Sequence, residues 1–334
     1  MATGGMVASA HPLVTSAGLQ TLAAGGNAVD AAVSAALVAS VVMPEMCGLG
    51  GDLFAIVHDP RRPGPVTYLG SGIAPRGLSY ERVKAASPGG HLMPNQGPLS
   101  IGVPGMVAGY RDLLREHGSK AFAELVGPAL HHAEAGHPVG QGLADHFIPN
   151  VELLSSVPSS KAALLPGGKA PVAGQVLVQA DLARTFRRLI DAGLDDFYQG
   201  DLAQRIAGGI QELGGALTVE DMAGHETEIS TPLSVTYRGY RINQTGLPTQ
   251  GLVHLEALKI AEHALRAEEF WSERYIHIQV EAIKLAFADR LGYAQDPRTG
   301  DTPVERLLSG EWAARRAAEI GDSATAEASA GQFQ

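Results

Sequence analysis

The chain has 334 residues, of which 45% are apolar, so it is long enough to bury a sizeable core. Its formal net charge of −10 excludes nucleic acid as the main partner, because phosphate binding requires clustered Lys and Arg. Cys47 is the only cysteine, which excludes a disulfide within the chain.

The beginning of the chain predicts two helices in succession. Pro12 can open the first helix, and the pair Gly25-Gly26 closes it. Asn27 then caps a second helix, which Pro44 stops. This second helix is apolar on nearly all sides, which is typical of a helix inside a layered core.

A hairpin and a long loop follow the two helices. Residues 52–59 are a short apolar run after glycines and predict a buried strand, and residues 65–70 can pair with it. Residues 71–103 are rich in Gly, Pro and Ser, and a loop of this length is usually functional or partly ordered into short elements. A helix resumes at Pro104 and ends near Gly118.

The second half of the chain is more helical and begins after a further predicted loop. Strands and helices together indicate a layered α+β or α/β architecture. The strongest helix places Ile276, Val280, Ile283, Phe287 and Leu291 on one face. The predicted elements are the loop over 155–175, helices over 181–192 and 202–213, strands within 232–243, and helices over 250–265 and 272–291.

The most visible motif is CGLGGD, residues 47–52. It lacks the Gly-Lys-Ser/Thr of a phosphate loop, and its glycines precede the strand, unlike those of a dinucleotide fingerprint. Two interpretations remain open at this point. The glycines either make a tight turn into the strand or let a ligand approach the backbone closely.

The usual catalytic constellations are missing. No Cys-His motif surrounds Cys47, so a small buried residue is the better interpretation of it. His131, His132 and His137 cluster without a zinc-ligand pattern, and the sequence predicts no metal and no cofactor. The stretch GSGIA, residues 70–74, does not fit a nucleophile elbow.

Several blocks, taken in order, resemble the large chain of the gamma-glutamyltransferase family. They cover nearly the whole chain, and the ordered set is specific although no single block is. The blocks are GGMVASAHPLVTSAGLQTLAAGGNAVDAAVSAAL (4–37), GLGGDLF (48–54), VPGMVAGY (103–110), DDFYQGDLAQRIAGGIQELGGALTVEDMAGHE (195–226), YRGYRINQTGLPTQGLVHLEALKIAE (237–262) and EAIKLAFADRLGYAQDP (281–297).

The resemblance implies an N-terminal-nucleophile hydrolase with an α+β, four-layer αββα sandwich, whose sheets a separate small chain completes. Such a precursor cuts itself, and the first residue of the small chain is a threonine whose hydroxyl is the nucleophile and whose α-amine is the base. The oxyanion donors come mainly from the small chain. The nucleophile would thus follow Gln334, whose carbonyl is attacked during processing, and residues 319–334 would be a flexible tail at that site.

The chain departs from the family at two positions. Gamma-glutamyl enzymes grip the substrate's α-carboxylate with an arginine five residues after the proline of an Ala-Pro pair. Here the pair is Ala74-Pro75, and Tyr80 stands at that position, with Arg76 directly after the proline. Asp52 stands where further glycine is usual. These differences disfavour glutathione as the substrate.

The prediction is one domain over residues 1–334, the large chain of a cytoplasmic N-terminal-threonine hydrolase or acyltransferase. The cytoplasmic location rests on the lack of a secretory signal, and the longest apolar stretch is too short to span a membrane. The expected partners are the small chain, in a heterodimer or a dimer of heterodimers, and a small amide or acyl substrate. Three alternatives remain open: a scaffold without activity, an enzyme using Cys47, and a relative from antibiotic biosynthesis that cleaves a C–C bond of a proline precursor. The predicted substrate-binding residues are Gly50, Gly51, Asp52, Arg76 and Tyr80.

Overall fold

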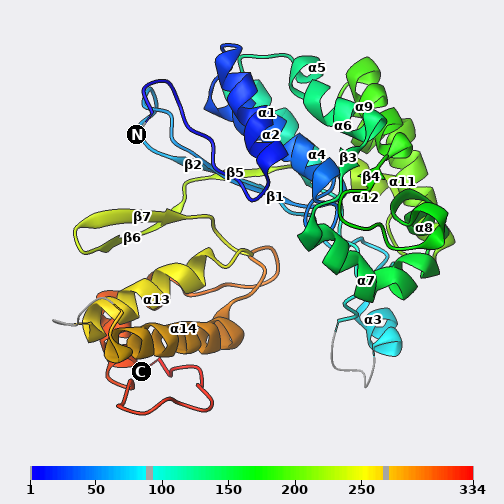
Figure 1. Cartoon of the computed structure of the whole chain (residues 1–334). Coiled ribbons are helices and arrows are strands. Elements are labelled where there is room, and N and C mark those ends of the chain that lie inside the picture. Colours follow the sequence, from blue (N-terminus) through cyan, green and yellow to red (C-terminus); the bar gives the residue numbers. More distant parts are fainter. Residues whose placement is uncertain (1, 88–92, 266–270, 334) are drawn as a thin grey trace. The chain divides into compact units, whose positions relative to one another are not determined.

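The computed structural model describes residues 2–87, 93–265 and 271–333. The chain divides into two compact units, one made of Met1–Leu53 and Gly70–Thr227 and the other of Phe54–Leu69 and Glu228–Gln334. Figure 1 shows the elements of both units. Their mixture of helices and small sheets confirms the α+β class. One domain over residues 1–334 stays a prediction.

The first unit is mostly helical and contains a two-stranded sheet that pairs β3 with β4. Its elements are α1 (Pro12–Ala23), α2 (Ala28–Val42), α3 (Tyr80–Ala86), α4 (Met106–His117), α5 (Phe122–Leu125), α6 (Gly127–Ala135), β3 (His137–Pro138), α7 (Gln141–Ser156), α8 (Pro158–Leu164), the 3-10 turn η2 (Pro166–Gly168), β4 (Val176–Leu177), α9 (Ala180–Ala192), α10 (Asp196–Gln199), α11 (Asp201–Glu212) and α12 (Val219–Ala223).

Helix α2 begins at the predicted cap. The Asn27 side-chain oxygen accepts hydrogen bonds from the amides of Val29 and Asp30 at 2.8 and 3.0 Å, and Asp30 accepts one from the Asn27 amide at 2.8 Å. Asp30 is fully buried and also accepts from the amide and the hydroxyl of Ser119. Burial opposes its ionisation, but these hydrogen bonds hold the pKa of Asp30 below its ordinary value. A buried carboxylate therefore ties the start of α2 to the segment after α4.

The loop predicted over residues 155–175 is largely helical, so that prediction is wrong. Helix α7 extends to Ser156, and α8 begins directly afterwards at Pro158. Proline at the first position of a helix loses nothing, because its missing amide hydrogen would have no partner there. Over residues 71–103, by contrast, the short helix α3 confirms that part of the loop is ordered.

The second unit holds a three-stranded sheet in the order β1-β2-β5 and the separate hairpin β6-β7. Strands β2 and β5 run antiparallel with Tyr68 opposite Ile229. Helix α13 packs on the hairpin and on helices α14 and α16. The elements are β1 (Leu53–Val57), β2 (Val66–Gly70), β5 (Glu228–Ser230), β6 (Leu233–Tyr237), β7 (Tyr240–Gln244), α13 (Gly251–Ala264), α14 (Glu273–Tyr293), α15 (Val304–Leu307) and α16 (Gly310–Ala317).

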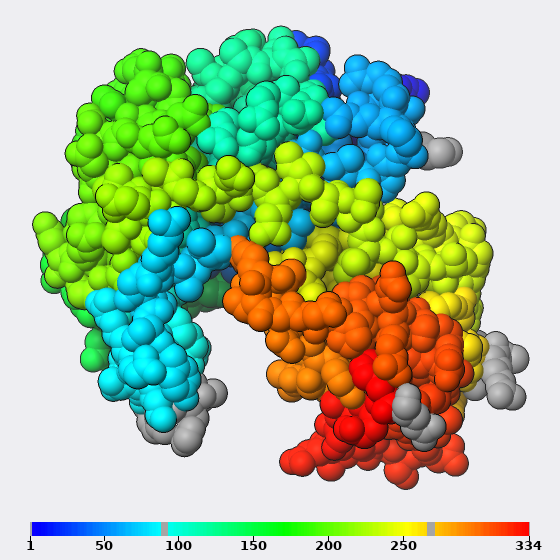
Figure 2. All heavy atoms as spheres, turned by 180° about the vertical axis from the view of Figure 1, so that it is seen from behind, coloured from blue at the N-terminus to red at the C-terminus, as the bar shows by residue number. Residues whose placement is uncertain are grey.

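Helix α14 buries a different face from the one its spacing predicts. Its buried side chains Ile278, Ala282 and Leu285 pack with Ile260 of α13 and Ala313 of α16. The predicted apolar stripe is 42–80% exposed instead, and α14 lies at the surface of its unit in amber and orange in Figure 2. The helix therefore has two apolar faces, and the larger side chains lie on the outer one: Ile276, Val280, Ile283, Phe287 and Leu291.

A charged network lies inside the second unit, between α13, α14 and α16. Trp312 donates its indole N–H to Glu256 at 2.8 Å and to Asp289 at 3.2 Å. Arg316 Nε lies 2.9 Å from Asp289 Oδ2, an ion pair although the two groups are not aligned as a hydrogen bond. Burial, followed by the neighbouring Asp289, raises the pKa of Glu256 well above its ordinary range. Glu256 therefore keeps its proton at neutral pH, and Asp289 is the charged partner of Arg316.

This raised pKa predicts that stability falls as pH rises. The protonated Glu256 stabilises the fold fully below its ordinary pKa of 4.5, and this contribution is lost as pH rises through the higher folded-state pKa. Glu256→Gln mimics the protonated form, so we expect it to flatten the decline of Tm between about pH 5 and 8. Each kcal/mol regained raises Tm by roughly 2–4 °C.

Thermal unfolding of both forms across this pH range measures the effect. Glu311→Gln, at an exposed position of α16, is the matched control and leaves the slope as in the wild type. Identical slopes for Glu256→Gln and the wild type would contradict a protonated Glu256.

Candidate substrate-binding site

The glycine-rich turn after α2 is fixed to the beginning of α4. The Gly51 amide donates to the Gly48 carbonyl at 2.9 Å, which closes the turn. The Gly51 carbonyl then accepts from the amides of Gly105 and Met106 at 3.1 and 2.9 Å. These amides have no partner within the helix, so the turn satisfies donors that the start of α4 would otherwise leave free.

Two backbone segments approach each other beside this turn. The Val103 amide donates to the Ile73 carbonyl at 3.0 Å. A Cβ atom added at Gly72 would lie 1.6 Å from the Val103 carbonyl oxygen, and one at Gly105 would lie 2.1 Å from that of Gly70. Only glycine permits this approach, so these residues set the position of the loop against α4.

Turn and loop together enclose a cavity of about 480 Å³ within the first unit. Among the described residues that line it, only Asp52 has a charged side chain and Ser100 adds a hydroxyl, while the rest is backbone and apolar surface. Such a cavity has the size and character of a small-molecule site. The lining residues are Gly50, Gly51, Asp52, Gly72, Ala74, Leu78, Met93, Ser100, Ile101, Gly102 and Val103.

Of the predicted substrate-binding residues, the structure brings Gly50, Gly51 and Asp52 together in this cavity. Arg76 is not among the lining residues: its side chain is 74% exposed, and its Nε lies 3.9 Å from Asp221. Tyr80 begins α3, is 70% exposed and does not line the cavity either. Residues 100–102 of the lining carry no motif in the sequence, and their only signal is that they lie in the predicted long loop over 71–103.

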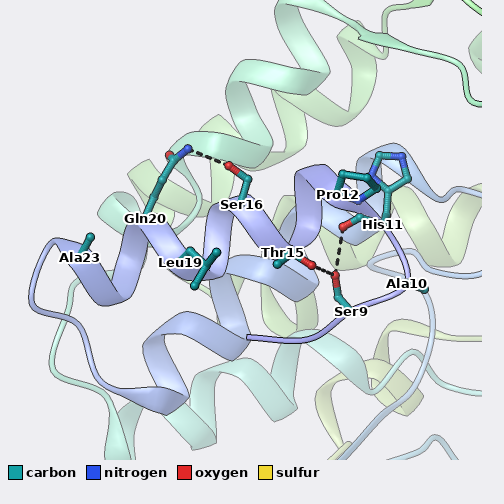
Figure 3. A pocket seen from close by; sticks show the side chains of 9 residues that line it. All are labelled: Ser9, Ala10, His11, Pro12, Thr15, Ser16, Leu19, Gln20 and Ala23. Carbon is teal, nitrogen blue, oxygen red and sulfur yellow. Dashed lines mark hydrogen bonds between the residues drawn. The ribbon is translucent and has the colours of Figure 1, made fainter. Parts of the chain in front are cut away.

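A larger hollow of about 770 Å³ lies along α1 (Figure 3). Its polar side chains already bond to one another: Ser9 contacts Thr15 at 2.7 Å, and Gln20 donates to Ser16 at 3.0 Å. Burial lowers the pKa of His11, which disfavours a positive charge there. We therefore place the candidate site at the glycine-rich cavity.

The cysteine and the histidines considered as catalytic or metal-binding candidates are not among the lining residues of this cavity. Burial and then Glu45 raise the pKa of the half-buried Cys47 thiol, which disfavours the reactive thiolate. His137 is buried, and its pKa falls to about 4, mainly by burial and then by His132. Within residues 2–87, 93–265 and 271–333, no three His, Cys, Asp or Glu side chains are placed to hold a metal ion. Gln334 lies outside the described residues.

None of the helices in the described ranges combines the length and the apolar character that a bilayer span requires.

Comparison with known proteins identifies the class to which this fold and cavity belong. The sequence pattern of gamma-glutamyltranspeptidase matches residues 14–334. The glutathione hydrolase-like YwrD proenzyme of Bacillus subtilis (strain 168) is 38% identical over 318 residues, 95% of this chain and 60% of that protein. The chain spans less than two thirds of the length of the first curated relatives it matches.

Solved structures of related proteins show the same relationship in three dimensions. The gamma-glutamyltranspeptidase of Helicobacter pylori superimposes with a TM-score of 0.91 at 31% identity, covering 98% of this chain and 95% of that one. The cephalosporin acylase of Bacillus halodurans gives a TM-score of 0.86 at 35% identity, covering 93% of this chain and 58% of that one. The fold is that of the N-terminal-nucleophile hydrolases, as predicted. The chain belongs to the gamma-glutamyltranspeptidase family.

The close backbone approach predicts a sharp difference between two glycines of the cavity wall. Gly72→Ala forces a methyl group against a carbonyl, so we expect it to destabilise the protein by about 1–3 kcal/mol. Gly50→Ala is the matched control: an added Cβ meets nothing within 4 Å, and the expected change is within about 0.5 kcal/mol. Urea unfolding measures both. Equal losses would show that the approach does not constrain the wall.

Proposed function

We propose that this chain is the large chain of a two-chain N-terminal-threonine hydrolase or acyltransferase acting on a small amide or acyl substrate. The observation that carries the proposal is the family match over residues 14–334, together with the glycine-walled cavity. A chain of nearly the same length forms the H. pylori structure, while the acylase chain is much longer. No cofactor is part of the proposal, and the cytoplasmic location stays a prediction.

In the proposed reaction, the threonine after Gln334 supplies both nucleophile and base. Its hydroxyl oxygen attacks the substrate carbonyl, and its α-amine takes the hydroxyl proton and passes it to the departing amine. The resulting ester is then attacked by water or by an acceptor amine, which releases the acyl group and restores the hydroxyl. The large chain would form a wall for the acyl group with Gly50, Gly51 and Asp52.

The substrate we favour lacks the gamma-glutamyl α-carboxylate. Tyr80 stands where the family's carboxylate-binding arginine is expected, and a phenol offers no positive charge and no planar fork. Arg76 has a nearby carboxylate, Asp221, as a partner. A charged hydrogen bond contributes about 1.5–3 kcal/mol, so its loss is large enough to change the substrate class.

The exposed stripe of α14 supports a partner chain. Scattered apolar residues on a surface need no explanation, but a continuous row usually marks an interface. A small chain corresponding to the rest of the relatives' length would cover Ile283 and Phe287 at its centre. This would give the second apolar face of α14 the burial that this chain alone does not provide.

Self-cleavage is the direct test of the proposed function. We expect a precursor that continues beyond Gln334 to give two bands on a denaturing gel, with threonine at the new amino terminus by mass spectrometry. Replacing that threonine with alanine should leave one band, because the attacking hydroxyl is gone. A single band from the unaltered precursor would favour the scaffold alternative.

Substrate choice is tested with gamma-glutamyl p-nitroanilide. We expect very slow turnover by the processed protein, and Tyr80→Arg should raise kcat/KM by about 10-fold or more by restoring a carboxylate partner. Tyr80→Phe is the matched control and should bring no gain. Fast turnover by the unaltered protein would refute this assignment of the substrate class.

A further inference from the structure

Residues 321–333 form neither helix nor strand, yet hydrogen bonds hold them along α14 and α16 of the second unit (Figure 1, red). Their partners on α14 advance from its beginning to its end, so the segment runs in the same direction as the helix. In order, the contacts are Gly321 O with Arg274 and His277 at 3.0 and 2.8 Å, Thr325 O with Lys284 at 2.5 Å, Thr325 N with Glu281 at 3.2 Å, Ser329 O with Arg316 at 2.8 Å, Gly331 N with Asp289 at 2.7 Å and Gln332 O with Arg315 at 2.8 Å.

Two of these partners, Asp289 and Arg316, belong to the charged network between α13, α14 and α16. Asp289 and Arg316 are 0% and 2% exposed. Asp289 directs one carboxylate oxygen at Arg316 and the other at the Gly331 amide, and Arg316 donates to the Ser329 carbonyl. Charged groups at such depth need their hydrogen bonds, because an unsatisfied one costs several kcal/mol. Without the segment, both groups would lose a partner.

The end of the segment fits an aromatic site. The Phe333 ring centre lies 4.4 Å from that of Trp312 and 4.6 Å from that of Tyr293, and the Arg306 guanidinium lies 4.1 Å from it on the ring face. Tyr293 also donates its hydroxyl to the Gly331 carbonyl. Such aromatic and cation–π contacts each contribute on the order of 1 kcal/mol.

The position of Gly331 has no room for a side chain. A Cβ added there would lie 2.6 Å from the Trp312 ring and 3.0 Å from Arg316. Peptide-recognition sites combine hydrogen bonds to the main chain with pockets for side chains, and this segment meets both kinds of contact.

We infer that α14 and α16 form a binding site for a peptide, and that its ligand is the chain's own segment Ser329–Phe333. After the proposed cleavage at Gln334, this site holds the new end of the large chain in place. Only this last role rests on the proposed function, because the contacts themselves involve residues before the cut.

Hydrogen exchange on the processed two-chain protein tests the inference. We expect the Gly331 amide to exchange slowly, because it donates to a buried carboxylate. Phe333→Ala removes the aromatic contacts and should speed exchange over 329–333 at least about 10-fold. Gln332→Ala is the matched control, since the contact of Gln332 is made by its backbone carbonyl. Circular dichroism checks that the variants keep their helices.

Fast exchange at Gly331 in the unaltered protein, or equal rates in Phe333→Ala and Gln332→Ala, would overturn the inference. A denaturing gel of the same sample separates the two proposals. An uncut product would overturn self-cleavage, while the exchange comparison would still decide whether the site exists.

Discussion

The close approach of two backbone segments at Gly72 and Gly105 is the constraint on which the first unit's cavity depends. It allows the Ile73 carbonyl to accept a hydrogen bond from the Val103 amide, and it brings the loop against the start of α4. The Gly51 carbonyl then bonds to the same helix start, so turn, loop and helix share one set of hydrogen bonds. A side chain at either glycine would separate the segments, and the wall of the cavity would move with them.

A wall built in this way offers a substrate mainly backbone and apolar surface. Asp52 brings a negative charge to it, and the lining residues that the structure describes include no Lys or Arg. An anionic acyl group would therefore meet repulsion at this wall, whereas a neutral or amine-bearing group would not. The physical character of the cavity and the tyrosine at position 80 thus point in the same direction, although Tyr80 lies outside the lining.

Local signals in the sequence predicted much of the fold. Asn27 caps α2 as predicted, because its side chain accepts hydrogen bonds from amides two and three residues later, and the sequence alone contains that information. Periodicity predicted the helix α14 and its row of apolar side chains, but it could not show which parts of the protein cover each face of the helix. The buried face contains Glu281 and Asp289, acidic residues that are normally expected on the surface, and only their partners in the folded chain explain their burial.

The site likewise could be predicted where the signal is local in the sequence, but not where it depends on contacts in the folded chain. The glycine-rich turn could be recognised from residues 47–52, but the lining from residues 100–103 depends on a contact between distant segments. Composition predicted a flexible tail because Ala, Ser and Gly segments usually fray. The contacts of residues 321–333 are made with side chains of α14 and α16. The composition of the segment itself does not predict these contacts.

The charge state of the buried network determines what the peptide site can recognise. Arg316 pairs with Asp289 inside the network and with Glu319 at its edge, so the network offers the segment hydrogen bonds from groups whose charges are already paired. Those bonds go to backbone groups, which every peptide possesses, and they give affinity without selecting a sequence. Selection must then come from shape, namely the absence of a side chain at Gly331 and the ring of Phe333 between Trp312 and Tyr293. A segment without that glycine and that ring would leave the buried charges with fewer partners.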